Sequence, residues 1–311
     1  MDYQIVKPVI KYLPNVRVVC KTKKLQHELL QLGISTQRLP AFPAKLIMPR
    51  HSIHYFPEKK IKIIGMRHGV YHFKKFINSK KYNVFDKFLF TSPTEEREAR
   101  DIGITTGVGI GFPKIDPLFT GEINEQAINE LKKKLGFNEK PIILFSATWD
   151  KSGLSAVDKW ASDISELAKK YHILVTLHPW ISQKYFDLIS ENKEVWFIQD
   201  NDILPYLAIA DVMISDTSSI IAEFCSLNKP IITFEIPVQN RLSKKIYQML
   251  EEISERVKSF DELKSVLPKV LKEPEKCAVN RDKWNKILYY KLDGKAGKRA
   301  AEEIMKVFSE Q

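Results

Sequence analysis

The sequence predicts an α/β protein made of two facing, doubly wound domains, each with a mostly parallel sheet covered by helices on both faces. Two observations lead to this fold class. Short apolar runs alternate with amphipathic helical patterns along the 311 residues, which is typical of parallel strands joined by helices. A charged helical stretch at about 121–140 interrupts this alternation, and a second alternation starts at Pro141. We therefore expect domains at residues 1–137 and 138–280, with C-terminal helices at 281–311 that pack back across them.

The first half contains short apolar runs typical of buried strands. They lie at residues 16–20, 45–48, 61–65 and 86–91. After the first run, KLQHELLQLG indicates a helix that Gly33 ends. After the last run, Pro93 and Glu95 indicate another helix start, because proline and acidic residues favour the first helical turn.

The second half repeats the alternation. We expect strands at IILFSAT, HILVTLHP and VWFIQ, and helices at SAVDKWASDISELAKK, SQKYFDLISE and ILPYLAIA. The spacing of Val157, Trp160, Ile164 and Leu167 predicts that the first of these helices buries one face. The last forty residues indicate two helices broken at Asp293-Gly294, which are too few elements for a third domain.

The stretch 211–234 is chemically the most informative. It indicates four pieces in order: a strand at 211–215, a turn at 216–219, a helix at about 220–227 and a strand at 231–234. The turn lies where a parallel strand ends and a helix begins, so backbone N–H groups and the hydroxyls of Thr217, Ser218 and Ser219 could hold an anion there. Glu223, one helical turn further on, could accept hydrogen bonds from ribose hydroxyls. A simple helix cap by Asp216 or Thr217 fits the same residues.

Two facing domains bind ligands at the carboxyl ends of their strands, so polar residues that follow strands are candidates for a cleft. Besides the turn, these candidates are Arg67, His68, Gly69, Gly111, Pro113, Ser146, Thr148 and His178. His68 could act as general base toward an attacking hydroxyl, since imidazole takes up a proton near neutral pH. A histidine that only completes the rim of the sheet fits the same position. His178 is better placed to hydrogen-bond a phosphate.

The composition, with 44% hydrophobic and 28% charged residues, is that of a globular protein. No apolar run approaches the roughly 20 residues of a membrane span. The N-terminal residues lack the pattern of a signal peptide, so we expect a cytoplasmic protein. The cysteines, Cys20, Cys225 and Cys277, form no CxxC pair, and no HExxH or HxxxH motif predicts a metal site. GVGIG at 107–111 is followed by Pro113 instead of a helix, which argues against dinucleotide binding.

The formal net charge of +11 is concentrated locally. Residues 59–87 hold nine Lys and Arg against one acidic residue, with five aromatic residues among them. This mixture suits an anionic membrane surface or a nucleic-acid groove, and it equally fits solvated lysines above core aromatics. The candidates for such a patch are Lys74, Lys75, Lys80 and Lys81.

Taken in order, the motifs resemble those of one family. They are RHG at 67–69, Ser92-Pro93, GFPKID at 111–116, LHPW at 177–180, ISDTSSIIAEFCSLNKPIITFE at 214–235 and LDGKAGKRAAEEI at 292–304. This order is similar to that of the CDP-glycerol glycerophosphotransferase family, the teichoic-acid primases and polymerases. The resemblance covers residues 61–304, and its most specific parts are the SDTSS string with its following glutamate and the final DGKA.

The resemblance implies a GT-B-like fold and a transferase in which an acceptor hydroxyl attacks the β-phosphorus of CDP-glycerol and CMP leaves. It implies that His68 is the catalytic base and that His178 contacts the donor pyrophosphate. It assigns the phosphates to Asp216, Ser218 and Ser219, and places Glu223 near the nucleotide. It further implies a lipid-linked saccharide acceptor, no tightly bound cofactor, and a peripheral location on the inner face of the cell membrane.

Three alternatives stay open. CDP-ribitol or another activated alditol would leave the same marks as CDP-glycerol. A nucleotide-sugar glycosyltransferase or a UDP-sugar 2-epimerase would share the fold and the turn with an acidic residue behind it. A non-catalytic nucleic-acid-binding protein would use the positive charge, although the basic cluster lies in one half and the best-ordered motifs indicate a phosphate-binding crevice.

Overall fold

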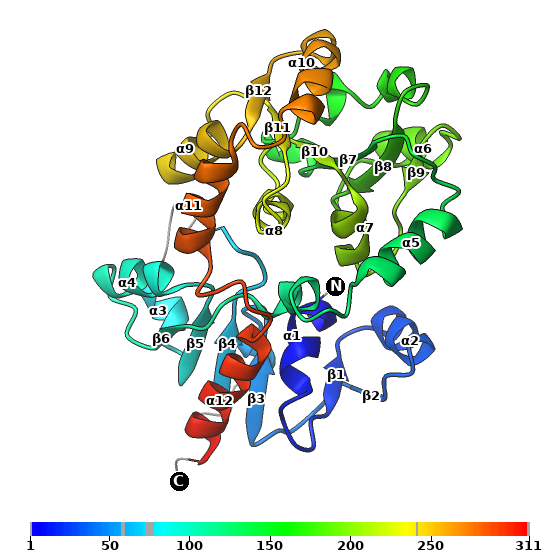
Figure 1. Cartoon of the computed structure of the whole chain (residues 1–311). Coiled ribbons are helices and arrows are strands. Elements are labelled where there is room, and N and C mark those ends of the chain that lie inside the picture. Colours follow the sequence, from blue (N-terminus) through cyan, green and yellow to red (C-terminus); the bar gives the residue numbers. More distant parts are fainter. Residues whose placement is uncertain (1, 57–59, 72–77, 241, 310–311) are drawn as a thin grey trace.

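The computed structural model describes residues 2–56, 60–71, 78–240 and 242–309, and the chain forms two halves that each contain a parallel sheet (Figure 1). The lower half in Figure 1 holds a four-stranded sheet in the order β3-β4-β5-β6, and the upper half holds a six-stranded sheet in the order β12-β11-β10-β7-β8-β9. A two-stranded parallel sheet, β1-β2, lies beside the lower half. The predicted α/β class with two parallel sheets is confirmed.

The first half contains all four predicted strands, together with β2 and β6. Its strands are β1 (Val18–Cys20), β2 (Thr36–Arg38), β3 (Lys45–Met48), β4 (Lys62–Met66), β5 (Lys87–Phe90) and β6 (Gly107–Gly109). Its helices are α1 (Asp2–Ile10), α2 (Lys23–Gln31), α3 (Ser79–Tyr82) and α4 (Pro93–Asp101), with the 3₁₀ helices η1 (Ile53–Tyr55) and η2 (Pro113–Leu118). The predicted start of α4 is confirmed, because the Ser92 hydroxyl accepts a hydrogen bond from the Glu95 N–H at 3.1 Å and Pro93 opens the helix.

The second half carries the larger sheet. Its strands are β7 (Ile142–Ala147), β8 (His172–Leu177), β9 (Trp196–Phe197), β10 (Val212–Ser215), β11 (Ile231–Phe234) and β12 (Glu255–Val257). Its α-helices are α5 (Glu125–Lys134), α6 (Gln183–Ser190), α7 (Leu204–Ile209), α8 (Ile220–Cys225), α9 (Lys244–Ile253) and α10 (Phe260–Lys272). The 3₁₀ helices are η3 (Asp150–Ser152), η4 (Val157–Lys159) and η5 (Ile164–Leu167).

The helix predicted at 155–170 is wrong, because this segment forms η4, η5 and turns. Its apolar side chains are nevertheless buried as expected, including Trp160 and Ile164. Local side-chain hydrogen bonds compete with the helix: the Ser155 hydroxyl accepts from the Val157 N–H, and the Asp216 carboxylate accepts from the Ala156 N–H. The segment therefore buries the expected face with a different backbone.

The chain ends with α11 (Ala278–Leu288) and α12 (Ala296–Ser309), which lie on either side of the predicted break. Helix α11 packs against α8 and α9 of the upper half and α4 of the lower half, and α12 packs against α1 and η2 (Figure 1). The Tyr290 N–H between them donates to the Thr91 carbonyl at 2.9 Å. The end of the chain thus connects the two halves. We keep 1–137, 138–280 and 281–311 as proposed boundaries along the sequence, although α5, which precedes residue 138, packs against α7 of the upper half.

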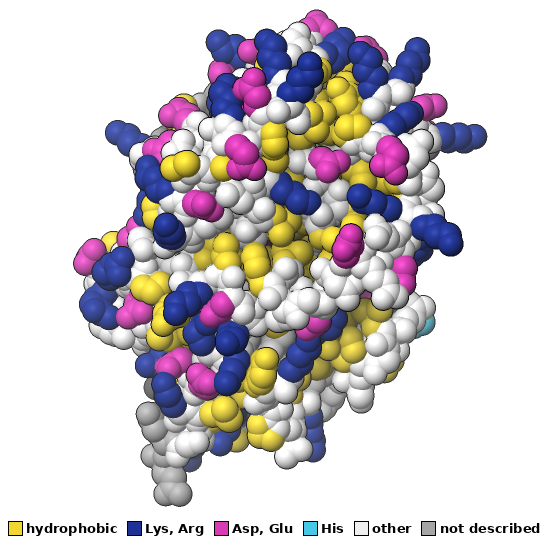
Figure 2. Space-filling view, in the orientation of Figure 1, with side chains coloured by type: hydrophobic (Ala, Val, Ile, Leu, Met, Phe, Trp, Pro, Cys, Tyr) yellow, Lys and Arg dark blue, Asp and Glu magenta, His cyan; other side chains and the backbone are white. Residues whose placement is uncertain are grey.

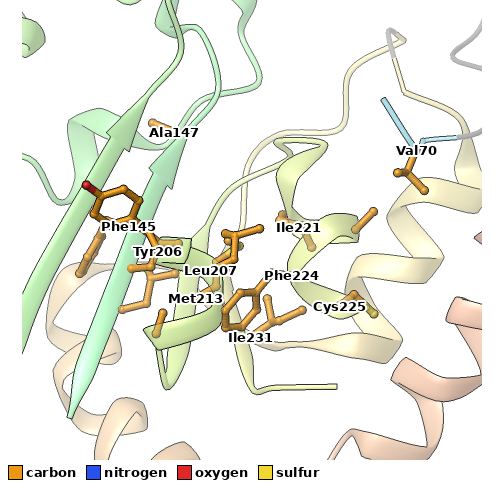
Figure 3. Close-up of a cluster of buried hydrophobic side chains, with 14 of the residues drawn as sticks. Val70, Phe145, Ala147, Tyr206, Leu207, Met213, Ile221, Phe224, Cys225 and Ile231 are labelled. Carbon is orange, nitrogen blue, oxygen red and sulfur yellow. The ribbon is translucent and has the colours of Figure 1, made fainter. Parts of the chain in front are cut away.

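The main hydrophobic core surrounds α8. Figure 3 shows Ile221 and Phe224 of this helix among Met213 of β10 and Ile231 of β11, with Val70 from the first half on the opposite side. Cys225 is fully buried here, which confirms the prediction that it is a core residue. The position of α8 is therefore set by packing against both halves of the chain. Across the described ranges, no helix combines the length and apolarity that crossing a membrane requires.

Candidate functional site

The segment after β4 meets the turn after β10, so strand ends from the two halves lie together. A Cβ added to Gly69 would lie 3.5 Å from the Ser219 Oγ. The hydroxyl of Tyr71 donates to the Ser218 carbonyl oxygen at 2.9 Å. Burial raises the pKa of Tyr71 well above 10, so the phenol keeps the proton it donates. His68 directly precedes Gly69 in the chain and is exposed.

Asp216 lies beneath the turn. Its carboxylate is completely buried and accepts hydrogen bonds from the N–H and hydroxyl of Thr148, and from the N–H groups of Ala156, Thr217 and Ser218. Burial raises the pKa of Asp216, although these hydrogen bonds act in the opposite direction. A carboxylate occupied in this way cannot also hold a phosphate. We therefore assign Asp216 to positioning the turn and the 148–156 loop, in place of the direct phosphate contact that the sequence suggested.

The remaining turn residues divide into one buried and two partly exposed side chains. The Thr217 hydroxyl is buried and donates to the Leu154 carbonyl oxygen at 3.0 Å, so it also supports the loop. Ser218 and Ser219 are half-buried at the start of α8, a helix of six residues. Among the four residues of the turn, these two are the ones whose side chains are partly exposed.

Glu223 forms an ion pair that spans the two halves. Lys114, in η2, places its Nζ 2.7 Å from the Glu223 Oε2. The Lys114 side chain is 17% exposed and that of Glu223 only 6%. No role was predicted for Lys114 itself, although the GFPKID segment that contains it follows β6 at the predicted cleft.

His178 lies just after β8 with an aromatic pair beside it. Its Nδ1 accepts a hydrogen bond from the Trp180 N–H at 3.1 Å, so the proton of the neutral ring is on Nε2. The Trp180 ring is 62% exposed and meets the Trp149 ring edge-on, with 5.5 Å between ring centroids. Ser182 donates its N–H to the Asp150 carboxylate at 2.9 Å, which holds the two loops together. His178 thus stands on a braced loop one strand away from β7.

The other predicted cleft residues mainly support the structure. The Arg67 guanidinium pairs with the fully buried Glu95 and donates to the Tyr71 carbonyl oxygen at 3.2 Å. Gly111 has a φ of +100°, and a Cβ there would lie 2.8 Å from that of Ala296, so glycine lets α12 approach closely. Three further predicted cleft residues are placed as follows: Pro113 opens η2 and is buried, Ser146 is buried within β7, and Thr148 bonds Asp216.

The predicted basic patch is described only in part. Lys80 and Lys81 are exposed on α3, whereas Lys74 and Lys75 lie outside the described residues. Phe85, one of the interleaved aromatics, belongs to the core. Figure 2 shows Lys and Arg side chains spread over one face of the molecule, with acidic and apolar side chains between them. Over the described ranges, no three His, Cys, Asp or Glu side chains gather as a metal site would require.

Comparison with known proteins identifies the family. The family model described as CDP-Glycerol:Poly(glycerophosphate) glycerophosphotransferase matches residues 56–306. Teichoic acid ribitol-phosphate polymerase TarK of Staphylococcus aureus is 27% identical over 285 residues, which are 84% of this chain and 52% of that protein. Teichoic acid poly(glycerol phosphate) polymerase of Bacillus spizizenii is 29% identical over 143 residues, 42% of this chain and 35% of that protein. The chain thus spans a third to a half of the length of these relatives.

Solved structures confirm the GT-B-like fold. A structure of the wall teichoic acid polymerase TagF soaked with CDPG matches with a TM-score of 0.73 and 18% identity, over 99% of this chain and 85% of that chain. UDP-GlcNAc 2-epimerase from Neisseria meningitidis, bound to UDP-GlcNAc, matches with a TM-score of 0.66 and 14% identity, over 98% of this chain and 96% of that chain. Two proteins with different chemistry share this architecture, so the site must distinguish their functions.

Proposed function

The chain belongs to the CDP-glycerol:poly(glycerophosphate) glycerophosphotransferase family, and on this basis we propose that it transfers a polyol phosphate from a CDP-activated alditol to an acceptor hydroxyl. CDP-glycerol is the proposed donor. CDP-ribitol is the close alternative, because the names of the matching relatives include both glycerol phosphate and ribitol phosphate. A lipid-linked saccharide or a growing polyol-phosphate chain is the proposed acceptor.

The contact between Gly69 and Ser219 is the observation that carries this proposal. It brings Gly69, the residue after His68, close to the turn that follows β10 in the other half. In the proposed step, the acceptor oxygen forms a bond to the β-phosphorus of the donor, and the bond from that phosphorus to the CMP oxygen breaks. His68 takes the acceptor proton, and CMP leaves with the electron pair of the broken bond.

The second half would hold the donor. The Nε2–H of His178 and the hydroxyls of Ser218 and Ser219 are suited to the pyrophosphate oxygens, because they donate hydrogen bonds to an anion whose charge shifts toward CMP in the transition state. Glu223 is suited to the ribose hydroxyls, since a carboxylate accepts hydrogen bonds. Asp216 and Thr217 would act indirectly by holding the turn.

A donor series tests the function. The melting temperature should be measured with CDP-glycerol, CDP-ribitol and UDP-GlcNAc, each at about 100 times its dissociation constant or at the highest soluble concentration. A bound donor should raise the melting temperature by roughly 5 °C. Stabilisation by a CDP-alditol alone supports the proposal. Stabilisation by UDP-GlcNAc alone would replace it with a nucleotide-sugar function.

We further propose that the chain works at an anionic membrane surface. Residues 1–56 hold nine Lys and Arg against two acidic residues, which adds to the basic 59–87 segment. In the same region, Leu30, Leu32 and Phe42 are exposed, Phe42 at 94%. Apolar side chains beside basic ones suit a peripheral contact with anionic lipid.

Co-sedimentation with phosphatidylglycerol vesicles tests this contact. We expect salt-sensitive binding that is lost when Lys74, Lys75, Lys80 and Lys81 are replaced by Gln. Replacement of Lys133 and Lys134 on α5 is the matched control, because it removes charge from the second half. Equal vesicle binding by the four-lysine variant and the wild type would rule out these lysines as the membrane contact.

A further inference from the structure

Lys114 and Glu223 come from different halves, and their ion pair lies in the region where the donor is proposed to bind. Lys114 belongs to η2 after β6, and Glu223 lies on α8 one turn beyond the serines of the 216–219 turn. Their charged atoms are 2.7 Å apart, and both side chains are mostly buried. An ion pair that is mostly buried is screened little by dissolved salt.

Only one oxygen of the Glu223 carboxylate is used by this pair. Oε2 accepts the hydrogen bond from Lys114, while Oε1 accepts none from the described part of the chain. Oε1 is also not sealed from solvent, since it is absent from the buried polar atoms that lack a partner. The carboxylate therefore keeps one acceptor oxygen that no described residue uses.

The ammonium group of Lys114 compensates for a charge that would otherwise oppose the donor. A buried carboxylate without a partner is costly, and a nucleoside diphosphate brings further negative charge. The backbone around Lys114 is itself held in place, because Asp116 in the same 3₁₀ helix accepts hydrogen bonds from Ala296 and Gly297 at the start of α12. The direction of the Glu223 carboxylate is thus set from the first half.

We propose that Lys114 is a positioning residue for donor recognition: it holds Oε2 of Glu223 so that Oε1 accepts a hydrogen bond from a ribose hydroxyl of the donor nucleotide. This inference rests on the proposed function. It adds that the first half, which supplies the base, also determines how strongly the second half recognises a ribonucleotide.

Calorimetric titration with CDP and 2′,3′-dideoxy-CDP tests this proposal. The wild type should bind CDP at least about 10-fold more tightly, since a hydrogen bond to a charged group is lost with the hydroxyls. Lys114→Met and Glu223→Gln should reduce this ratio to less than about 3-fold. Lys114→Arg should retain most of the ratio, because it keeps the cation. If Lys114 contributed only to folding, the affinity ratio would not depend on whether residue 114 is cationic.

Lys245→Met is the matched control. Lys245 on α9 pairs with Glu98 on α4, so this variant also removes an ion pair between the halves, at a place away from the turn. Its CDP preference should equal that of the wild type. If Lys114→Met kept the wild-type preference for CDP over 2′,3′-dideoxy-CDP, the inference about Lys114 would be overturned while the proposed function would stand. A loss of this preference in Lys245→Met would have the same consequence. Failure of the wild type to bind either nucleotide would overturn the proposed function as well.

Discussion

The hydroxyl of Tyr71 donates a hydrogen bond to the backbone carbonyl oxygen of Ser218, and this bond joins the segment after β4 to the turn after β10. Tyr71→Phe should lower the free energy of unfolding by about 1 kcal/mol. It should also lower the rate of CMP release, because the segment that contains His68 loses a hydrogen bond to the turn where the donor is proposed to bind. Urea unfolding and a CMP-release assay measure the two effects.

Tyr289→Phe is the control for this prediction. The Tyr289 hydroxyl is also buried and donates to a backbone carbonyl, that of Ala222, at 2.8 Å. This variant should lose similar stability while keeping a near wild-type rate. Equal rates for the two variants would show that the Tyr71 bond has no special part in activity.

Asp216→Asn should destabilise the protein even though it preserves shape. Asp216 accepts hydrogen bonds from four backbone N–H groups and one hydroxyl, and the amide of Asn would turn an NH₂ group toward some of these donors. A loss of roughly 3 kcal/mol in the free energy of unfolding follows. Urea unfolding measures it, and a loss below about 0.5 kcal/mol would contradict the bracing role.

Asp116 gives the stability a pH dependence. Burial raises its pKa from 3.8 to about 6, against the opposing hydrogen bonds from Gly297 and Ala296. The folded state then holds a proton that the unfolded state has lost, so the free energy of unfolding falls as the pH rises from about 4 to about 6, by up to roughly 3 kcal/mol. Urea unfolding at pH 4, 5 and 6.5 should show this decline in the wild type and a flatter profile in Asp116→Asn. If the free energy of unfolding of Asp116→Asn depended on pH in the same way as that of the wild type, this role of Asp116 would be contradicted.

His178 should act through its Nε2. The Trp180 N–H occupies Nδ1, so a donor phosphate would meet the proton on the other nitrogen. His178→Gln, whose amide reaches the ε position, should weaken CDP binding less than His178→Asn does. Calorimetry compares the two, and the reverse order would place the phosphate elsewhere.

The sequence was sufficient to predict the local frame of the site. The strand, turn and helix from Val212 to Cys225 follow from an apolar run, a cluster of short polar residues and an amphipathic repeat, and the structure has all three. The predicted helix at 155–170 is wrong because its apolar spacing also fits 3₁₀ turns, and because the Ser155 hydroxyl and the Asp216 carboxylate accept hydrogen bonds from its backbone.

Side-chain partners were beyond reach of the sequence, because they depend on how the two halves meet. From the sequence alone, Asp216 could either face a bound anion or be buried and hold the turn in place. Its hydrogen bond from the Thr148 N–H, which comes from the distant 148–156 loop, shows that it is buried and holds the turn. Arg67, which was predicted to line the cleft, likewise pairs with the buried Glu95 on α4. Lys114 is more than a hundred residues from Glu223, so no local pattern connects them.

The central claim is that His68 removes the acceptor proton across the cleft. The most direct measurement is CMP release from CDP-glycerol with a lipid-linked acceptor, comparing the wild type, His68→Ala and His54→Ala; His54 is another exposed histidine, in η1. We expect His68→Ala to lose at least 100-fold in rate, about the lower range for a general base, while His54→Ala keeps the wild-type rate. Equal CMP release by His68→Ala and the wild type would contradict the claim.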